Sequence, residues 1–302
     1  MIDPENLDRL RVPTDKKVRL KDYDTGWEQT KELKELGKAA VKERAEEILN
    51  VNRAELAEAQ EMLFADDRAS VLIILQAMDA AGKDGTIKHV MSGVNPQGCQ
   101  VFSFKEPTRE ELGHDFLWRF ARRLPERGRI GIFNRSYYED VLVVKVHPEL
   151  LETQKLPPGK KGKSFWKARY EDINAFEHHL VRSGAVVLKF FLNVSKKEQK
   201  RRFLQRLERP EKNWKFSSAD IAERAYWDDY QKVYEEVFEA TSTEWAPWYI
   251  VPADQKWVTH GVVANLVIST IRGLGVSYPK MTEAQRAALD GARRQLESEP
   301  AF

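Results

Sequence analysis

The sequence predicts an α/β protein built on a parallel sheet with helices on both faces. Short apolar runs, rich in branched and aromatic residues, alternate along the chain with longer amphipathic stretches. Alternation of this kind favours parallel strands, because a crossover helix returns the chain to the same end of the sheet. With 302 residues, of which 42% are hydrophobic, the chain can bury such a core in one large domain.

Five runs have the length and composition of buried strands. They are residues 71–75 (VLIIL), 101–104 (VFSF), 129–133 (RIGIF), 185–192 (AVVLKFFL) and 248–252 (WYIVP). Helices are expected at about 85–93, 109–123, 166–182, 195–208, 218–240 and 257–273.

The segments outside this alternation predict the rest of the organisation. Residues 1–26 mix Pro, Asp and Lys without periodicity and are expected to form an N-terminal arm that lies extended on the surface. From residue 27 to residue 64, apolar residues at spacings near three and four predict a long amphipathic helix, with a break near residues 50–52 as an open alternative. Residues 27–275 are expected to form the main domain, 151–164 a mobile loop, and 276–302 a C-terminal helical tail.

Composition excludes several classes of function. The 49 basic and 47 acidic residues leave a net charge of only +2, so any site for a polyanion must be local. Cys99 is the single cysteine and cannot form an internal disulfide. No apolar run approaches the roughly 20 residues that span a bilayer, and the N-terminus does not resemble a signal peptide. We therefore expect a cytoplasmic protein without a membrane partner.

The stretch QAMDAAGKDGTI, residues 76–87, predicts a phosphate-binding loop. It differs from the pattern G-x-x-x-x-G-K-[ST], with Ala77 in place of glycine and Asp84 in place of Ser or Thr. It nevertheless follows the most convincing strand and precedes a helix, the arrangement in which backbone N–H groups hold phosphate oxygens. Gly82 and Gly85 would let the backbone close on the phosphates, and Lys83 would reach the transferred group. The neighbours expected to bind the same substrate are Ala80, Ala81, Thr86 and Lys88.

Two acids inside this loop indicate a divalent cation. Asp79 and Asp84 would repel bound phosphates unless a cation lies between them, so Mg²⁺ is implied, with Asp79 as its preferred ligand. Asp84 remains open to a second interpretation, as an acid favoured by the dipole at a helix N-terminus.

The stretch RIGIFNRSYYEDVLVV, residues 129–144, predicts a second part of the site. Asn134 follows the strand and can orient a ligand without adding charge, while Arg135 is placed to neutralise phosphate charge in the transition state. Glu139 or Asp140 would supply the missing carboxylate. An ordinary first turn of a helix would explain the acids but not the arginine.

Two basic clusters are candidate walls for a long anion, although each could instead be a solvated face. The first consists of Arg119, Arg122 and Arg123 on one predicted helix. The second, Arg206, Arg209, Lys212 and Lys215, lies in a segment at about 206–220 that is expected to close as a lid. Trp214 in this segment is a candidate contact for a nucleobase.

Several long motifs resemble the polyphosphate kinase type 2 family. They are LQAMDAAGKDGTIKHVMSGVNPQG, FNRSYYEDVLVV, RPEKNWKF, YWDDY and TSTEWAPWYIVPA, and the likeness runs from about residue 20 to residue 275. The resemblance implies a P-loop kinase fold similar to thymidylate kinase, a three-layer sandwich with a five-stranded parallel sheet and a helical lid. It also implies Mg²⁺-dependent phosphate transfer between inorganic polyphosphate and nucleotides.

The same resemblance assigns roles to single residues. Asp79, Lys83, Arg135 and Asp140 are implied to be catalytic, with Asp79 and Asp140 as ligands of Mg²⁺, and residues 206–215 correspond to the lid. The stretch Asn134 to Asp140 resembles the branch that phosphorylates nucleoside monophosphates and often diphosphates, so AMP would become ADP, and ADP would become ATP. An ATP-dependent nucleoside monophosphate kinase is the alternative that the fold alone permits.

The expected partners follow from this function. They are inorganic polyphosphate, AMP and ADP, together with further copies of the chain in a dimer or tetramer. Nucleic acid is not expected, because the sequence lacks the aromatic and basic sheet signature of a single-strand binder.

Overall fold

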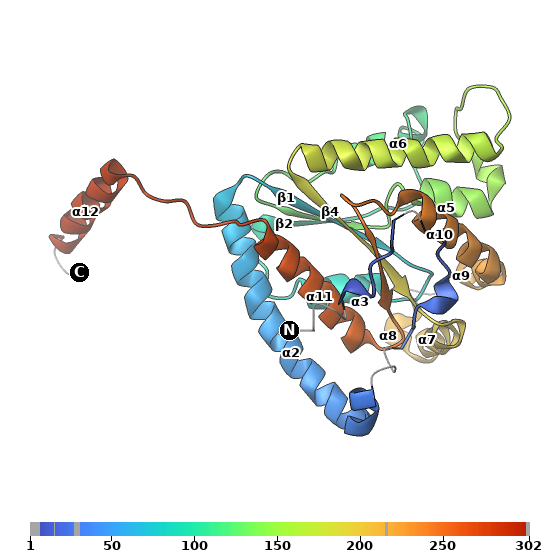
Figure 1. Ribbon diagram of the computed structural model, residues 1–302, viewed down its shortest axis with the longest axis horizontal. Helices are drawn as coiled ribbons and strands as arrows, with labels where there is room; N and C mark the ends of the chain where they lie inside the picture. Colours follow the sequence, from blue (N-terminus) through green and yellow to red (C-terminus); the bar gives the residue numbers. More distant parts are fainter. Residues whose placement is uncertain (1–6, 15, 27–30, 215–216, 300–302) are drawn as a thin grey trace.

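The computed structural model describes residues 7–14, 16–26, 31–214 and 217–299. Their centre is a sheet with helices around it (Figure 1). The sheet has five strands, all parallel, in the order β2-β3-β1-β4-β5. The strands are β1 Ser70–Gln76, β2 Cys99–Ser103, β3 Ile130–Asn134, β4 Ala185–Asn193 and β5 Trp248–Pro252. The predicted five-stranded parallel sheet is therefore confirmed.

The register of β1 brings two functional segments to one edge of the sheet. Every residue of β1 is buried, because β3 and β4 flank it and helices cover both faces. Leu75 near the end of β1 pairs with Asn134, the last residue of β3, and Asn134 pairs in turn with Ser103 at the end of β2. The loops that follow β1 and β3 consequently begin side by side.

Helices cover the sheet in two layers, which completes the predicted three-layer sandwich. One layer contains α2 Lys31–Asp66, α3 Lys83–Val90 and α11 Lys256–Gly273. The other contains α5 Glu139–Val146, α6 Lys163–Arg182 and α10 Trp227–Thr241. Within the described residues, no helix is both long and apolar enough to cross a membrane.

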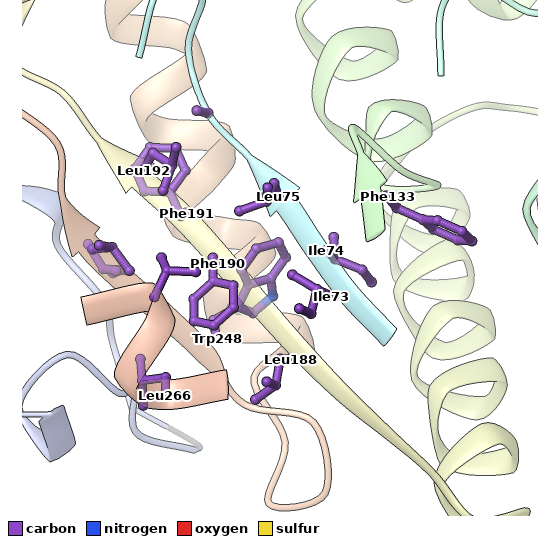
Figure 2. Packing of buried hydrophobic residues seen from close by; sticks show 14 of the residues in the cluster. Ile73, Ile74, Leu75, Phe133, Leu188, Phe190, Phe191, Leu192, Trp248 and Leu266 are labelled. Atoms are coloured by element: carbon purple, nitrogen blue, oxygen red, sulfur yellow. The ribbon is translucent and has the colours of Figure 1, made fainter. Parts of the chain in front are cut away.

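The core lies on both faces of β1 and β4. Successive residues of a strand point to opposite faces, so Ile73 and Ile74 serve different layers, as do Phe190 and Phe191 (Figure 2). The ring of Phe191 packs against Tyr234 of α10, with 4.3 Å between the ring centroids. These apolar contacts fix the sheet that carries the site.

Two predicted helices differ from the structure. Residues 109–123 form only η3 Glu111–Gly113 and α4 Trp118–Ala121, because the Asp115 carboxylate accepts the Leu117 N–H and turns the chain between them. Residues 218–240 form α9 Ser218–Glu223, η5 Arg224–Tyr226 and α10. By contrast, α2 runs without a break through residues 50–52, because α11 packs along it.

The segments at the two ends behave differently. The arm contains η1 Leu20–Asp22 and buries Val12, Val18 and Leu20 in the common core, so it does more than lie on the surface. The N–H groups of Val18 and Leu20 donate to two glutamates of α10. At the other end, α12 Glu283–Glu297 has no buried residue and projects from the body (Figure 1). The division at residues 26 and 275 stays a prediction.

Candidate active site

The segment between β1 and α3 has the backbone of a tight anion-binding loop. Ala80 and Gly82 both have positive φ, 59° and 114°. Glycine adopts such a conformation easily, whereas alanine does so only where its surroundings hold it. The helix N-terminus follows at once, since α3 begins at Lys83.

Side chains of helix α7, Lys196–Glu208, hold this loop by donating hydrogen bonds to the carbonyl groups of the loop. Gln199 Nε2 donates to the Asp79 carbonyl at 3.0 Å. The buried Arg202 donates from Nη1 to the carbonyls of Ala80 and Ala81 at 3.1 and 2.5 Å, and from Nη2 to that of Ala253 at 2.5 Å. Sequence reasoning missed both side chains, because only their spacing on one face of a helix distinguishes them from other polar residues.

Lys83 lies among the charges predicted for the site. Its Nζ donates to the Ala77 carbonyl at 2.8 Å. Burial lowers the pKa of Lys83, and nearby Arg135 acts in the same direction, while Asp79, Glu139 and Asp84 oppose the shift. The lysine is therefore part of the same electrostatic group as the residues that follow β3.

Arg135 connects the phosphate loop with α5. Its Nη2 lies 3.2 Å from Asp79 Oδ1, and its Nη1 lies 4.0 Å from Glu139 Oε2. The Arg135 N–H donates to the Leu75 carbonyl at the end of β1, and its φ is 65°. This strained backbone is the kind found where surrounding contacts orient a functional side chain.

Asn134 lies between the ends of three elements. Its Nδ2 donates to Asp84 Oδ1 at 2.9 Å and to Ser103 Oγ at 3.3 Å. Asp84 is in the first turn of α3, where an acid is favoured by the helix dipole. The structure thus brings together Asp79, Lys83, Asp84, Asn134, Arg135 and Glu139.

Asp140 is buried beside them, in the first turn of α5. Gln154 Nε2 donates to Asp140 Oδ1 at 3.0 Å, and Arg169 Nη1 donates to its backbone carbonyl at 2.7 Å. Burial raises the pKa of Asp140 to about 6, although Arg169 and Arg119 act in the opposite direction. Its carboxyl group therefore changes charge not far below neutral pH.

Two cavities meet at these residues. The first, the loop cavity, has a volume of about 970 Å³ and is lined by the phosphate loop, residues 79–86, together with Arg202 and Lys256. The second, the acidic cavity, has a volume of about 550 Å³ and is lined by Glu139, Asp140 and Tyr234. Both cavities are lined by Asp79, Phe104, Lys105, Arg135 and Asp220. The site is therefore two connected spaces with Arg135 at their junction.

The two predicted basic clusters are only partly at this site. Arg119 lines the acidic cavity, whereas Arg122 and Arg123 lie over the rings of Trp118 and Phe102 and line neither cavity. Lys88, which was also predicted to bind substrate, lies in the last turn of α3 and lines neither of the two cavities.

The predicted lid is a helical segment in which α8 Pro210–Asn213 and α9 follow α7. Arg206 lines the loop cavity and pairs with Asp220 of α9 at 3.4 Å, and the exposed Trp214 lines the same cavity. Arg209 is exposed and lines neither cavity. Lys215 and the side chain of Lys212 lie outside the described residues, so their predicted roles have no structural counterpart here.

The chemistry of the acidic cavity fits Mg²⁺. Among the described residues, no group of three or more His, Cys, Asp or Glu side chains forms a metal cage. Mg²⁺ commonly uses only one or two carboxylates and takes its other ligands from phosphates and water. Asp79 and Asp140 both line the acidic cavity and provide oxygen ligands of this kind.

Comparison with known proteins gives a consistent result. The model of the family described as polyphosphate kinase 2 (PPK2) matches residues 39–277. An ADP-polyphosphate phosphotransferase of Rhodopseudomonas palustris is 54% identical, over 84% of this chain and 89% of its own. An AMP/ADP-polyphosphate phosphotransferase of Meiothermus ruber is 43% identical, over 91% of this chain and 96% of its own. The crystal structure of polyphosphate kinase 2 from Arthrobacter aurescens TC1 superposes with a TM-score of 0.82 at 41% identity, covering 94% of this chain and 96% of that one.

Proposed function

The chain belongs to the polyphosphate kinase 2 family and is a polyphosphate:nucleotide phosphotransferase, and we propose that it phosphorylates AMP to ADP and ADP to ATP. The observation that carries this proposal is the meeting of two cavities at Asp79 and Arg135. One cavity contains the phosphate loop, and the other extends from the same pair towards α5 and α10. Donor and acceptor can therefore approach one point from separate spaces.

Polyphosphate is proposed to occupy the loop cavity. The N–H groups at the start of α3 and the ammonium of Lys83 would bind the oxygens of the terminal phosphate. Arg206 and Lys256 also line this cavity and would bind units further along the chain. This extended basic lining supports a polymeric donor over a nucleoside triphosphate such as ATP.

The nucleotide acceptor is proposed to occupy the acidic cavity. Its lining combines the basic side chain of Arg119, suited to a phosphate, with the rings of Tyr230 and Tyr234, suited to a base or ribose. At the junction, Arg135 would bind the phosphoryl group in transfer and orient it between donor and acceptor. Asp79 holds that guanidinium in place through their ion pair.

Asp79 and Asp140 are the residues proposed to hold Mg²⁺. The cation would offset negative charge on the phosphates during transfer. The ion pair with Arg135 engages Asp79 Oδ1 and leaves the Asp79 side chain 28% exposed, so its carboxylate can contact a cation in the cavity. Asp140 would have to be ionised, which its pKa of about 6 permits at neutral pH.

The test of this function compares donors. The protein is incubated with Mg²⁺ and AMP, and ADP is measured with polyphosphate as donor and separately with ATP as donor. We expect ADP to form rapidly with polyphosphate and to be further converted to ATP, and both rates to fall by on the order of 10²-fold or more in Lys83→Met. Turnover with ATP but not with polyphosphate would instead establish the nucleoside monophosphate kinase.

A cytoplasmic location and a dimer or tetramer are also proposed. Cys99 is a free thiol whose pKa burial raises to about 11, and unpaired thiols of this kind suit a reducing compartment.

The exposed Leu289 and Leu296 of α12 support an interface with another copy. Light scattering of the purified chain measures its mass directly, and a monomer would contradict the second proposal.

A further inference from the structure

We propose that the loop cavity contains a distal phosphate subsite, formed by Lys256 with the stacked rings of His89 and His260, which binds polyphosphate units beyond those on the phosphate loop. The proposal rests on the proposed function, because it assigns these residues to the polymeric donor. It adds a reason for the enzyme to distinguish long chains from short ones.

The cavity is large enough for such an extension. Its volume of about 970 Å³ is near the upper end of the roughly 300–1,000 Å³ of small-molecule sites. Its lining includes His89 of α3 and Lys256, Thr259 and His260 of α11, in addition to the phosphate loop. A phosphate loop contacts only a few phosphates, so the remaining volume is available to the rest of the chain.

Two helices begin at this cavity. Lys83 is the first residue of α3, and Lys256 is the first residue of α11, where the Gln255 side chain makes no capping hydrogen bond. The first N–H groups of a helix carry partial positive charge and favour anions. In α11 this charge is joined by the Lys256 ammonium, so the second helix adds to the attraction that the phosphate loop exerts.

The pKa values of the two stacked histidines indicate a positive electrostatic potential around them. Their ring centroids are 4.6 Å apart, with an interplanar angle of 21°. Burial lowers the pKa of His260 to about 4, and partial desolvation lowers the pKa of the exposed His89. Every charged group that contributes further to these two shifts is basic, and these groups come from α2, α3, α7 and α11. They are Arg53, Lys88, Arg202 and Lys256, and His89 also lowers the pKa of His260.

A concentration of cations of this kind is unfavourable in the free protein and favourable with a polyanion bound. The neutral imidazoles can each donate one N–H to a phosphate oxygen without further repulsion among the cations. Because this subsite lies beyond the transferred group, it should affect the binding of the chain more than the transfer step. Its signature is a change in KM that depends on the length of the donor.

The experiment compares tripolyphosphate with long-chain polyphosphate as donor, at saturating AMP and Mg²⁺. In Lys256→Ala, we expect the KM for the long chain to rise roughly two- to fivefold, as for loss of one partly screened charge interaction. The KM for tripolyphosphate should rise less, and kcat should change less than KM. The matched control is Lys167→Ala, an exposed lysine on α6 in the opposite helical layer, which should leave both KM values unchanged.

A second variant separates binding from folding. His89 is exposed, so His89→Asn should keep the thermal melting temperature and still raise the KM for the long chain more than that for tripolyphosphate. Lys256→Arg should restore most of the affinity that Lys256→Ala removes. An equal rise for both donors, or no rise for either, would overturn the distal subsite. Wild-type protein that uses ATP but no polyphosphate of any length would overturn the proposed function instead.

Discussion

Asn134 Nδ2 donates to Asp84 Oδ1 over 2.9 Å, and this hydrogen bond joins two of the positions at which the site departs from an ordinary phosphate-loop enzyme. Asp84 stands where the loop pattern has Ser or Thr, and Asn134 ends the strand where a metal-associated acid is usual. A neutral amide can satisfy the Asp84 carboxylate, whereas a second carboxylate would repel it. The two departures are therefore complementary.

Asn134→Asp should depress phosphorylation of AMP more than that of ADP at matched free Mg²⁺. The added carboxylate would face Asp84 and would also oppose an incoming phosphate, by roughly 4 kcal/mol at 4 Å and an effective dielectric near 20, before screening. Asn134 lines the loop cavity, and this prediction places the doubly charged α-phosphate of AMP, as the nucleophile, at the edge of that cavity. Steady-state rates with each acceptor decide the matter, and an equal fall in both, or improved use of AMP, would exclude Asn134 as the acceptor discriminator.

Lys83→Met should fold normally and reduce phosphotransfer by on the order of 10²-fold or more, because it removes a charge that meets the transferred phosphate. In the free protein the substitution removes a hydrogen bond from Lys83 Nζ to the Ala77 carbonyl, which is a small part of the stability of the fold. Turnover and thermal melting are measured on the same preparation. Near-normal turnover with unchanged melting would remove Lys83 from the catalytic group.

Arg206→Ala should raise the KM for polyphosphate, because this arginine, at the start of the predicted lid, lines the loop cavity. The difference from wild type should shrink as ionic strength increases, since salt screens partly exposed charges. Arg209, which is exposed and lines neither cavity, provides a comparison on the same segment. If Arg206→Ala has the KM of wild type at low salt, the arginine acts only through its ion pair with Asp220.

Asp140→Asn should gain stability relative to wild type as pH rises from about 4 to above about 6. Burial raises the pKa of the Asp140 carboxyl from 3.8 to about 6, so the folded wild type holds its proton over this range while the unfolded chain releases it. The free energy of unfolding of the wild type thus falls with rising pH, by up to about 3 kcal/mol. Urea unfolding in EDTA at a series of pH values measures the difference. If the free energies of unfolding of the two proteins changed in parallel with pH, ionisation of Asp140 would not destabilise the fold.

The strands and the principal motifs were predictable because their signals are local. A run such as residues 71–75 is apolar on both faces, and only a buried central strand accommodates that pattern. The loop before Lys83 and the segment around Arg135 were recognisable for a similar reason, since each joins a strand to a helix with a distinctive residue order. The prediction for residues 109–123 was wrong because a side-chain hydrogen bond to Asp115 overrode the helical pattern.

By itself, the sequence determined the sheet, the phosphate loop and the candidate residues Asp79, Lys83, Asn134 and Arg135, since each lies next to a strand end that the hydrophobic pattern defines. Only the tertiary structure decided that Arg202 holds the loop from a position more than 120 residues away, and that Arg119 lines the site while Arg122 does not. The physical reason is that packing between helices selects which polar side chain on each helix faces a cavity. Sequence spacing specifies the helix, but the partner against which it packs fixes the direction of each side chain.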